Sequence, residues 1–83
     1  MQPLATTINV RLFAALREQA GWGCRTMPLM GPSTPLQCWR ELELGGEHLP
    51  VGIRVAINQR FVAADTTLQA GDELAFLPPI SGG

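Results

Sequence analysis

Apolar and polar residues alternate along several short segments of this chain, and a single long amphipathic segment lies between them. Such alternation buries one face of a strand and exposes the other. Strands are therefore expected over residues 8–12, 23–29, 53–57, 61–62 and 73–77. A helix laid across one face of a mixed sheet is the two-layer arrangement that buries the apolar sides of both.

The main helix is expected to run from Pro35 to about Leu44. Thr34 suits the N-cap position, and Pro35 suits the first helical position because its missing N–H would be unpaired there anyway. Its buried face has helical spacing and consists of Pro35, Cys38, Trp39 and Leu42. A short extra helix over residues 13–20, ended by Gly21, is also expected. Its buried face would consist of Phe13, Leu16 and Ala20.

Pro28 cannot donate a backbone hydrogen bond, so the strand that contains it is expected at an edge of the sheet. The order of elements is that of the β-grasp, ubiquitin-like architecture. We therefore predict an α+β fold, with a mixed sheet of about five strands and one main helix across one face. Residues 1–83 are expected to form a single domain, from which residues 78–83 protrude as a C-terminal tail.

Composition excludes several classes of function. A net charge of −1 gives no basic surface for nucleic acid, and no apolar run approaches the ~20 residues of a membrane span. Residues 1–4 do not begin a signal peptide, so a cytoplasmic location is the expectation.

Candidate catalytic groups are few. His48 is the only histidine and is expected to be exposed in a loop, and the phosphate-binding and zinc-binding helix motifs are missing. Cys24 and Cys38 lack metal-binding spacing, and both are expected to be small buried hydrophobic residues. We therefore expect no metal site, no bound cofactor and no catalytic activity of the chain on its own.

The last residues have a composition that folding does not require. Gly82 and Gly83 carry no Cβ and place a bare α-carboxylate at the tip of a thin segment. Pro78 and Pro79 favour an extended path away from the sheet. Residues 78–83 reach at most roughly 20 Å, which is enough to enter the active site of another protein. There ATP would activate the carboxylate as an acyl-adenylate.

Leu77 should lie on the face of the sheet that carries no helix, because it alternates with Leu74 and Phe76. With Pro78, Pro79 and Ile80 it would form an exposed apolar strip. A strip of this kind indicates a surface for a protein partner.

Three segments resemble the family of molybdopterin synthase small subunits, the sulfur carriers of molybdenum cofactor biosynthesis. Residues 71–83, GDELAFLPPISGG, are similar to the family's ending, GDEVAFFPPVSGG, and this is the most specific part. Residues 10–21 resemble its first strand and following helix, and residues 55–59 its VAVN strand. The loop over residues 43–52 is shorter than is usual in the family, and this difference concerns packing alone.

The resemblance implies that the first and last strands lie side by side in parallel. It also implies that a ubiquitin-activating-like adenylyltransferase uses ATP to adenylate Gly83, which then becomes a thiocarboxylate. The tail would insert into the large catalytic subunit of molybdopterin synthase, in a heterotetramer, and give sulfur to cyclic pyranopterin monophosphate. The chain itself would be a non-catalytic, sulfur-donating subunit.

The residues expected to contact the partner are Leu77, Pro78, Pro79, Ile80, Ser81, Gly82 and Arg17. Arg17 is either half of an ion pair with the partner or a solvated helix residue. Three other functions stay open at this point. The chain could carry sulfur for thiamin, cysteine or tRNA thiolation, although thiamin carriers are typically shorter and lack the Pro-Pro spacer. It could be a ubiquitin-like modifier that forms isopeptides, or a plain interaction domain.

Overall fold

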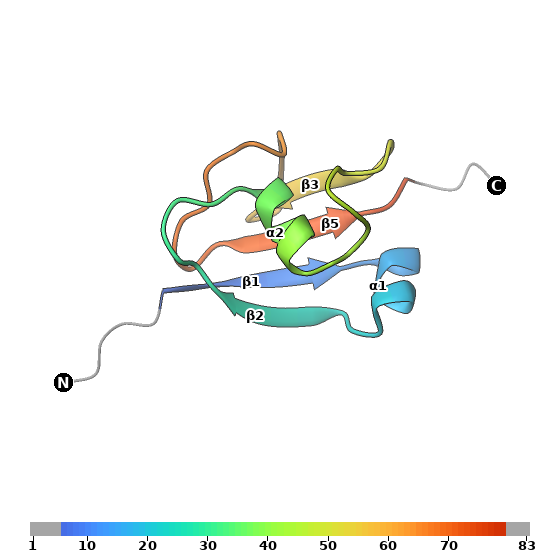
Figure 1. The fold of residues 1–83 in the computed structure, drawn as a ribbon, viewed down its shortest axis with the longest axis horizontal. Coiled ribbons are helices and arrows are strands. Elements are labelled where there is room, and N and C mark those ends of the chain that lie inside the picture. The colour runs from blue at the N-terminus through green and yellow to red at the C-terminus, as the bar shows by residue number, and fades with distance from the viewer. Residues whose placement is uncertain (1–5, 80–83) are drawn as a thin grey trace.

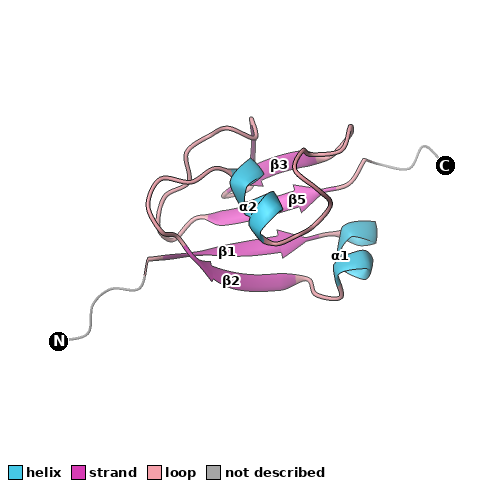
Figure 2. Cartoon of the chain, in the orientation of Figure 1, coloured by secondary structure: helices cyan, strands magenta, loops and turns pink. Residues whose placement is uncertain are grey.

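The computed structural model describes residues 6–79, and five strands and two helices lie within them. In chain order these are β1 (Thr7–Leu12), α1 (Ala14–Ala20), β2 (Cys24–Pro28), α2 (Pro35–Glu41), β3 (Arg54–Ile57), β4 (Arg60–Val62) and β5 (Glu73–Leu77). Helix α2 crosses one face of the sheet, and α1 sits at the end of β1 (Figures 1 and 2). Within residues 6–79, neither helix is long and apolar enough to cross a membrane.

The strands form one mixed sheet in the order β2-β1-β5-β3-β4. Strand β1 pairs with β5 in parallel, from Asn9 opposite Glu73 to Leu12 opposite Phe76, and the other pairs are antiparallel. This is the predicted β-grasp arrangement. The edge position of β2 is also confirmed, because this strand pairs with β1 alone among the described strands.

The core lies between α2 and the inward face of the sheet. Its largest fully buried side chains belong to Trp39 of α2 and Phe76 of β5, whose ring centroids are 5.2 Å apart in an edge-to-face arrangement. The inward residues of the two central strands surround them, namely Ile8, Val10, Leu12 and Leu74. The strand alternation read from the sequence therefore identifies the buried face correctly.

Helix α2 begins as predicted and ends earlier. Thr34 and Gln37 form a capping box, in which each side chain accepts a hydrogen bond from the other's backbone N–H. The expected end at Leu44 was wrong. Leu44 donates its N–H to the Trp39 carbonyl, and Glu43 adopts a left-handed conformation with φ of 55°. This is a Schellman ending, with Glu43 at the position that glycine usually takes.

Two predictions of burial were wrong, each for a local reason. Phe13 is 36% exposed because it caps α1 in an extended conformation, so helical spacing does not govern its side chain. Leu16 is buried and Ala20 half-buried, as expected. Cys24 is exposed because it pairs with Arg11 on the face of the sheet that carries no helix. Cys38 is buried on the side of α2 that faces the sheet, as expected.

The start of β5 is fixed by hydrogen bonds to the β3–β4 turn. Asn58 and Gln59 have φ of 52° and 70°, which makes a tight turn between β3 and β4. The Asn58 side chain accepts from the Glu73 backbone N–H and donates to the Asp72 carboxylate, both at 2.9 Å. Asp72 also accepts from the Gln69 backbone N–H. The register of the last strand, and hence the place where the tail begins, depends on this network.

We expect Phe76→Ala to lower the free energy of unfolding by roughly 3–5 kcal/mol, because it leaves a cavity against Trp39. Phe61→Ala is the matched control, since Phe61 is 58% exposed and the same truncation there creates little cavity. Urea denaturation of both variants measures the difference. Equal losses of stability would contradict the placement of Phe76 at the centre of the core.

Candidate functional site

Strand β5 leads from the core directly to the tail. Leu74 and Phe76 are fully buried beneath α2, and Leu77 is half-buried on the opposite face. Pro78 is half-buried and Pro79 is exposed, so the chain emerges at the end of the sheet. Because β1 and β5 are parallel, α1 lies at the same end as the emerging chain (Figure 1). The remaining predicted tail residues are outside the described part: Ile80, Ser81, Gly82 and Gly83.

The face of the sheet opposite α2, which we call the helix-free face, carries a shallow hollow of about 280 Å³. Its floor is apolar and consists of Ala56, Ala75 and Leu77. Phe13 and Phe61 line its sides, together with Arg11, Gln59 and Glu73. Leu77 therefore lies where alternation predicts, on the helix-free face next to the root of the tail.

Arginines cover the two phenylalanines at the sides of this hollow. The guanidinium carbon of Arg54 lies 3.8 Å from the ring centroid of Phe61, and that of Arg11 lies 5.4 Å from the ring of Phe13. Arg11 also pairs with Glu73 at 3.3 Å, and both side chains are partly exposed. An exposed pair of this kind adds little to stability. The groups instead form a charged border around an apolar surface.

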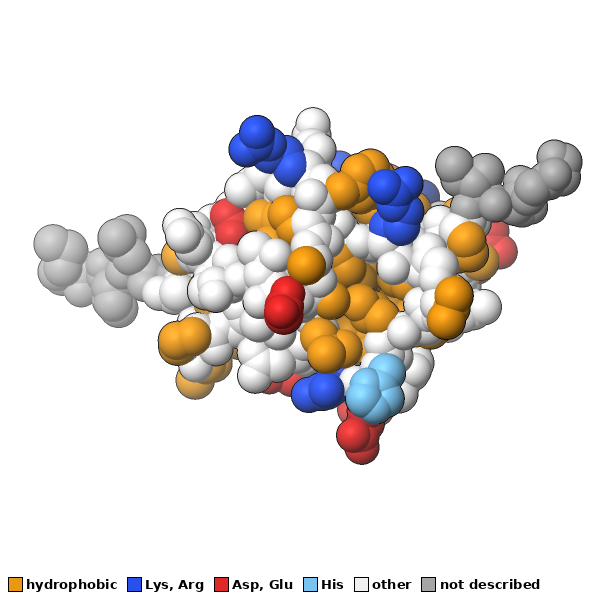
Figure 3. Space-filling model, turned by 90° about the horizontal axis from the view of Figure 1, so that it is seen from above, with side chains coloured by type: hydrophobic (Ala, Val, Ile, Leu, Met, Phe, Trp, Pro, Cys, Tyr) orange, Lys and Arg blue, Asp and Glu red, His pale blue; other side chains and the backbone are white. Residues whose placement is uncertain are grey.

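A second apolar groove follows the β3–β4 edge. It is lined by Leu49, Ile53, Arg54, Val55, Phe61, Val62, Ala63 and Ala64. Seen from above, the molecule shows hydrophobic side chains gathered in the middle of its surface, with arginine and acidic side chains around them (Figure 3). Phe61 and Arg54 line this groove, and Phe61 also lines the hollow of the helix-free face, so the two apolar surfaces adjoin.

Arg17 is exposed on α1 and shares a hollow with Arg11, Phe13 and Cys24. Its side chain lies against Gly23, where an added Cβ would be 3.0 Å from the Arg17 Nε atom. Within residues 6–79, the single ion pair joins Arg11 to Glu73, so no carboxylate of that part neutralises Arg17. The exposed guanidinium fits either of the two predicted roles, a partner ion pair or a solvated helix residue, and both remain predictions.

The two cysteines differ in their surroundings. Burial raises the pKa of the Cys38 thiol, and a contact with the Ser33 hydroxyl at 3.9 Å offsets this in part. A buried, protonated thiol is a poor nucleophile. Both cysteines are free. Cys38 therefore acts as a small hydrophobic residue of the core.

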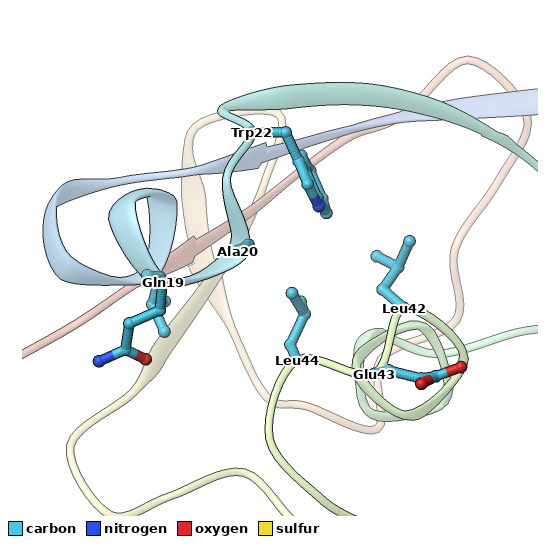
Figure 4. Close-up of a pocket in the computed structure, with 7 residues that line it drawn as sticks. Gln19, Ala20, Trp22, Leu42, Glu43 and Leu44 are labelled. Atoms are coloured by element: carbon cyan, nitrogen blue, oxygen red, sulfur yellow. The ribbon is translucent and has the colours of Figure 1, made fainter.

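Another hollow lies between the end of α1 and the turn after α2 (Figure 4). Trp22, Leu42 and Leu44 point toward it, whereas Gln19 and Glu43 point away from its centre. Arg25 lies over the Trp22 ring at 4.3 Å. Within the described residues, no group of three histidine, cysteine or acidic side chains could hold a metal ion. This hollow offers apolar packing and no reactive group.

The ThiS family matches residues 10–83, from the first strand through the tail. The chain belongs to the ThiS family. It is 37% identical to the molybdopterin synthase sulfur carrier subunit of Arabidopsis thaliana, over 92% of this chain and 82% of that one. It is 35% identical to the human protein of the same name, over the full length of both. The resemblance stated from the sequence is thus confirmed.

Several solved structures share the fold. Small archaeal modifier protein 1 of Haloferax volcanii superimposes with a TM-score of 0.78 at 28% identity, over 90% of this chain and 99% of that one. A complex of subunits 1 and 2 of the molybdopterin-converting factor from Helicobacter pylori contains a chain that matches with a TM-score of 0.58 and 25% identity. That match covers 93% of this chain and 99% of that one.

Sequence reasoning placed Leu77 on the helix-free face, as the structure has it, and missed the residues that border the hollow. Arg11 could have been predicted as a border residue, because alternation along β1 places its side chain on the face of the sheet away from Val10 and Leu12. Phe61 and Arg54 could not, since their contact depends on the pairing of β3 with β4.

Proposed function

We propose that this chain is the sulfur-carrier subunit of a molybdopterin synthase and that the carboxylate of Gly83 carries the sulfur. The observation that supports this most is the likeness to the human sulfur carrier subunit, which extends over the full length of both chains at 35% identity. The matched region includes the Gly-Gly ending, because the family match runs to residue 83.

In the proposed reaction, an adenylyltransferase partner binds the tail together with ATP. The Gly83 carboxylate attacks the α-phosphate and releases pyrophosphate, which leaves an acyl-adenylate. Hydrosulfide then attacks the acyl carbon and expels AMP, giving a thiocarboxylate. In the large subunit this sulfur passes to cyclic pyranopterin monophosphate, and hydrolysis of the acyl–sulfur bond returns the carboxylate. The chain acts in the cytoplasm in this scheme and binds no cofactor itself.

The chain's own contribution is to bind and to orient. Leu77 and the helix-free face provide an apolar docking surface with a charged border, and Pro78 and Pro79 join β5 to the tail. Holding the reacting group in a fixed geometry is a large part of what such a complex needs for rapid transfer. Within residues 6–79 the one histidine is exposed in a loop, so the large subunit would supply acid and base groups. A heterotetramer of two small and two large subunits is part of this proposal.

The likeness to an archaeal modifier protein favours a second candidate function. A ubiquitin-like modifier would use the same acyl-adenylate of Gly83, and the acyl group would then pass to a lysine amine of a target protein. The two functions share activation and differ in the final acceptor.

Removing Gly83, or adding one residue after it, is expected to abolish activation because the carboxylate no longer reaches the bound nucleotide. ATP–pyrophosphate exchange with the cognate adenylyltransferase measures this step. Thermal unfolding is the control, and we expect no change in Tm because the core lies within residues 6–79. Exchange at close to the parent rate by either variant would contradict the proposed role of Gly83.

Leu77→Glu is expected to weaken binding to the large subunit by roughly 2 kcal/mol, because it places an unpaired charge in an apolar contact. The control is Met30→Glu, which adds the same charge at a site that is 88% exposed and follows β2 at the other end of the sheet. Titration calorimetry gives both affinities, and Tm should change little in either variant. Parent-like binding by Leu77→Glu would mean that the helix-free face is not the docking surface.

A further inference from the structure

The register between β3 and β5 points to a contact beyond the ends of both strands. The last pair of this antiparallel ladder places Arg54 opposite Leu77. Two residues further along, the same register places Gly52 opposite Pro79. Their contact is close, because a Cβ added at Gly52 would lie 3.1 Å from both Cβ and Cγ of Pro79. Pro78 and Pro79 have no N–H, so packing takes the place of the next hydrogen bonds of the ladder.

The element that meets Pro79 is a closed turn. The Ile53 N–H donates to the Pro50 carbonyl at 3.1 Å, and Gly52 has φ of +94°. Ile53 packs against the core and holds one end of the turn, whereas Val51 at its tip is 100% exposed. Figure 1 shows the segment before β3 beside the place where the chain leaves β5. The turn therefore forms a fixed support next to the root of the tail.

We propose that Gly52 is a positioning residue for the tail. Because it lacks a Cβ, the ring of Pro79 can rest on the turn, which holds the last described residue of the tail root in place. A side chain at residue 52 would be tighter against Pro79 than van der Waals contact allows, and the Pro79 ring would have to shift by a few tenths of an ångström. This inference rests on the proposed function, since a fixed direction is useful only to a tail that must enter another protein. Ordering the root before binding reduces the entropy lost on insertion.

Gly52→Ala tests the role, and Gly46→Ala is a matched control. Gly46 has φ of +93°, so alanine there meets the same backbone penalty, but nothing lies within 4 Å of the added Cβ. In ATP–pyrophosphate exchange with the adenylyltransferase, we expect Gly52→Ala to raise the KM for the carrier about tenfold. Because a captured tail can still reach the nucleotide, kcat should stay at the parent value. Gly46→Ala should change neither, and the two variants should share one Tm.

Equal KM values for the two alanine variants would overturn the role of Gly52. If Gly52→Ala has the lower Tm, a double-mutant cycle with Pro79→Gly shows whether the rise in KM comes from the contact with Pro79 or from the loss of stability. Adding Gly52→Ala to Pro79→Gly should then cause no further rise in KM, and a further tenfold rise would contradict the proposal.

A measurement on the isolated protein separates this inference from the proposed function. Nuclear Overhauser effects between the Gly52 Hα protons and the Pro79 ring are expected in the parent and should weaken in Gly52→Ala. Their absence in the parent would overturn the contact itself. A parent that shows this contact but gives no exchange would contradict the proposed function and leave the contact in place.

Discussion

The parallel pairing of β1 with β5 in the middle of the sheet is the interaction on which the rest of the structure depends. It joins segments more than sixty residues apart, from Asn9 opposite Glu73 to Leu12 opposite Phe76. A parallel pair needs a long crossover connection, and here that connection contains β2, α2 and the β3–β4 hairpin. Every other element packs on, or extends, this central pair. The chain that leaves β5 therefore starts from a central strand whose inward residues, Leu74 and Phe76, are fully buried.

The two faces of the sheet have different uses. The face under α2 carries the core and supplies stability through Trp39, Phe76 and the inward residues of β1. The helix-free face carries small residues, one half-buried leucine and arginines stacked on phenylalanines. Those arginines shield aromatic surface in the free protein and keep their charges at the border. An apolar surface with such a border suits a partner that binds and releases, because it remains compatible with water when unoccupied.

Much of the fold could be predicted from the sequence because its main signals are local. Alternation identified the inward residues of β1 and β5, and Thr34 with Pro35 identified the start of α2. The end of α2 could not be predicted, because Glu43 takes the left-handed conformation at which a glycine would usually mark the end of a helix. Cys24 was wrongly expected to be buried, because the burial of a residue on an edge strand depends on which face of the sheet it shares with its partner on the neighbouring strand. The parallel pairing came from the family resemblance, since strand order leaves no periodic signal.

The candidate site also has a part that local sequence signals predict and a part that they do not. Leu77 follows from alternation along one strand, so the sequence suffices to place it. The contact between Gly52 and Pro79 follows from the register between two strands, and neither residue alone indicates it. The most direct test of the sulfur-carrier role is the intact mass of the protein purified from its native cells. We predict a species in which sulfur replaces one oxygen of Gly83, and we expect it to disappear when the adenylyltransferase is deleted. Attachment of Gly83 to lysines of other proteins, with no such species, would contradict the role and favour a modifier.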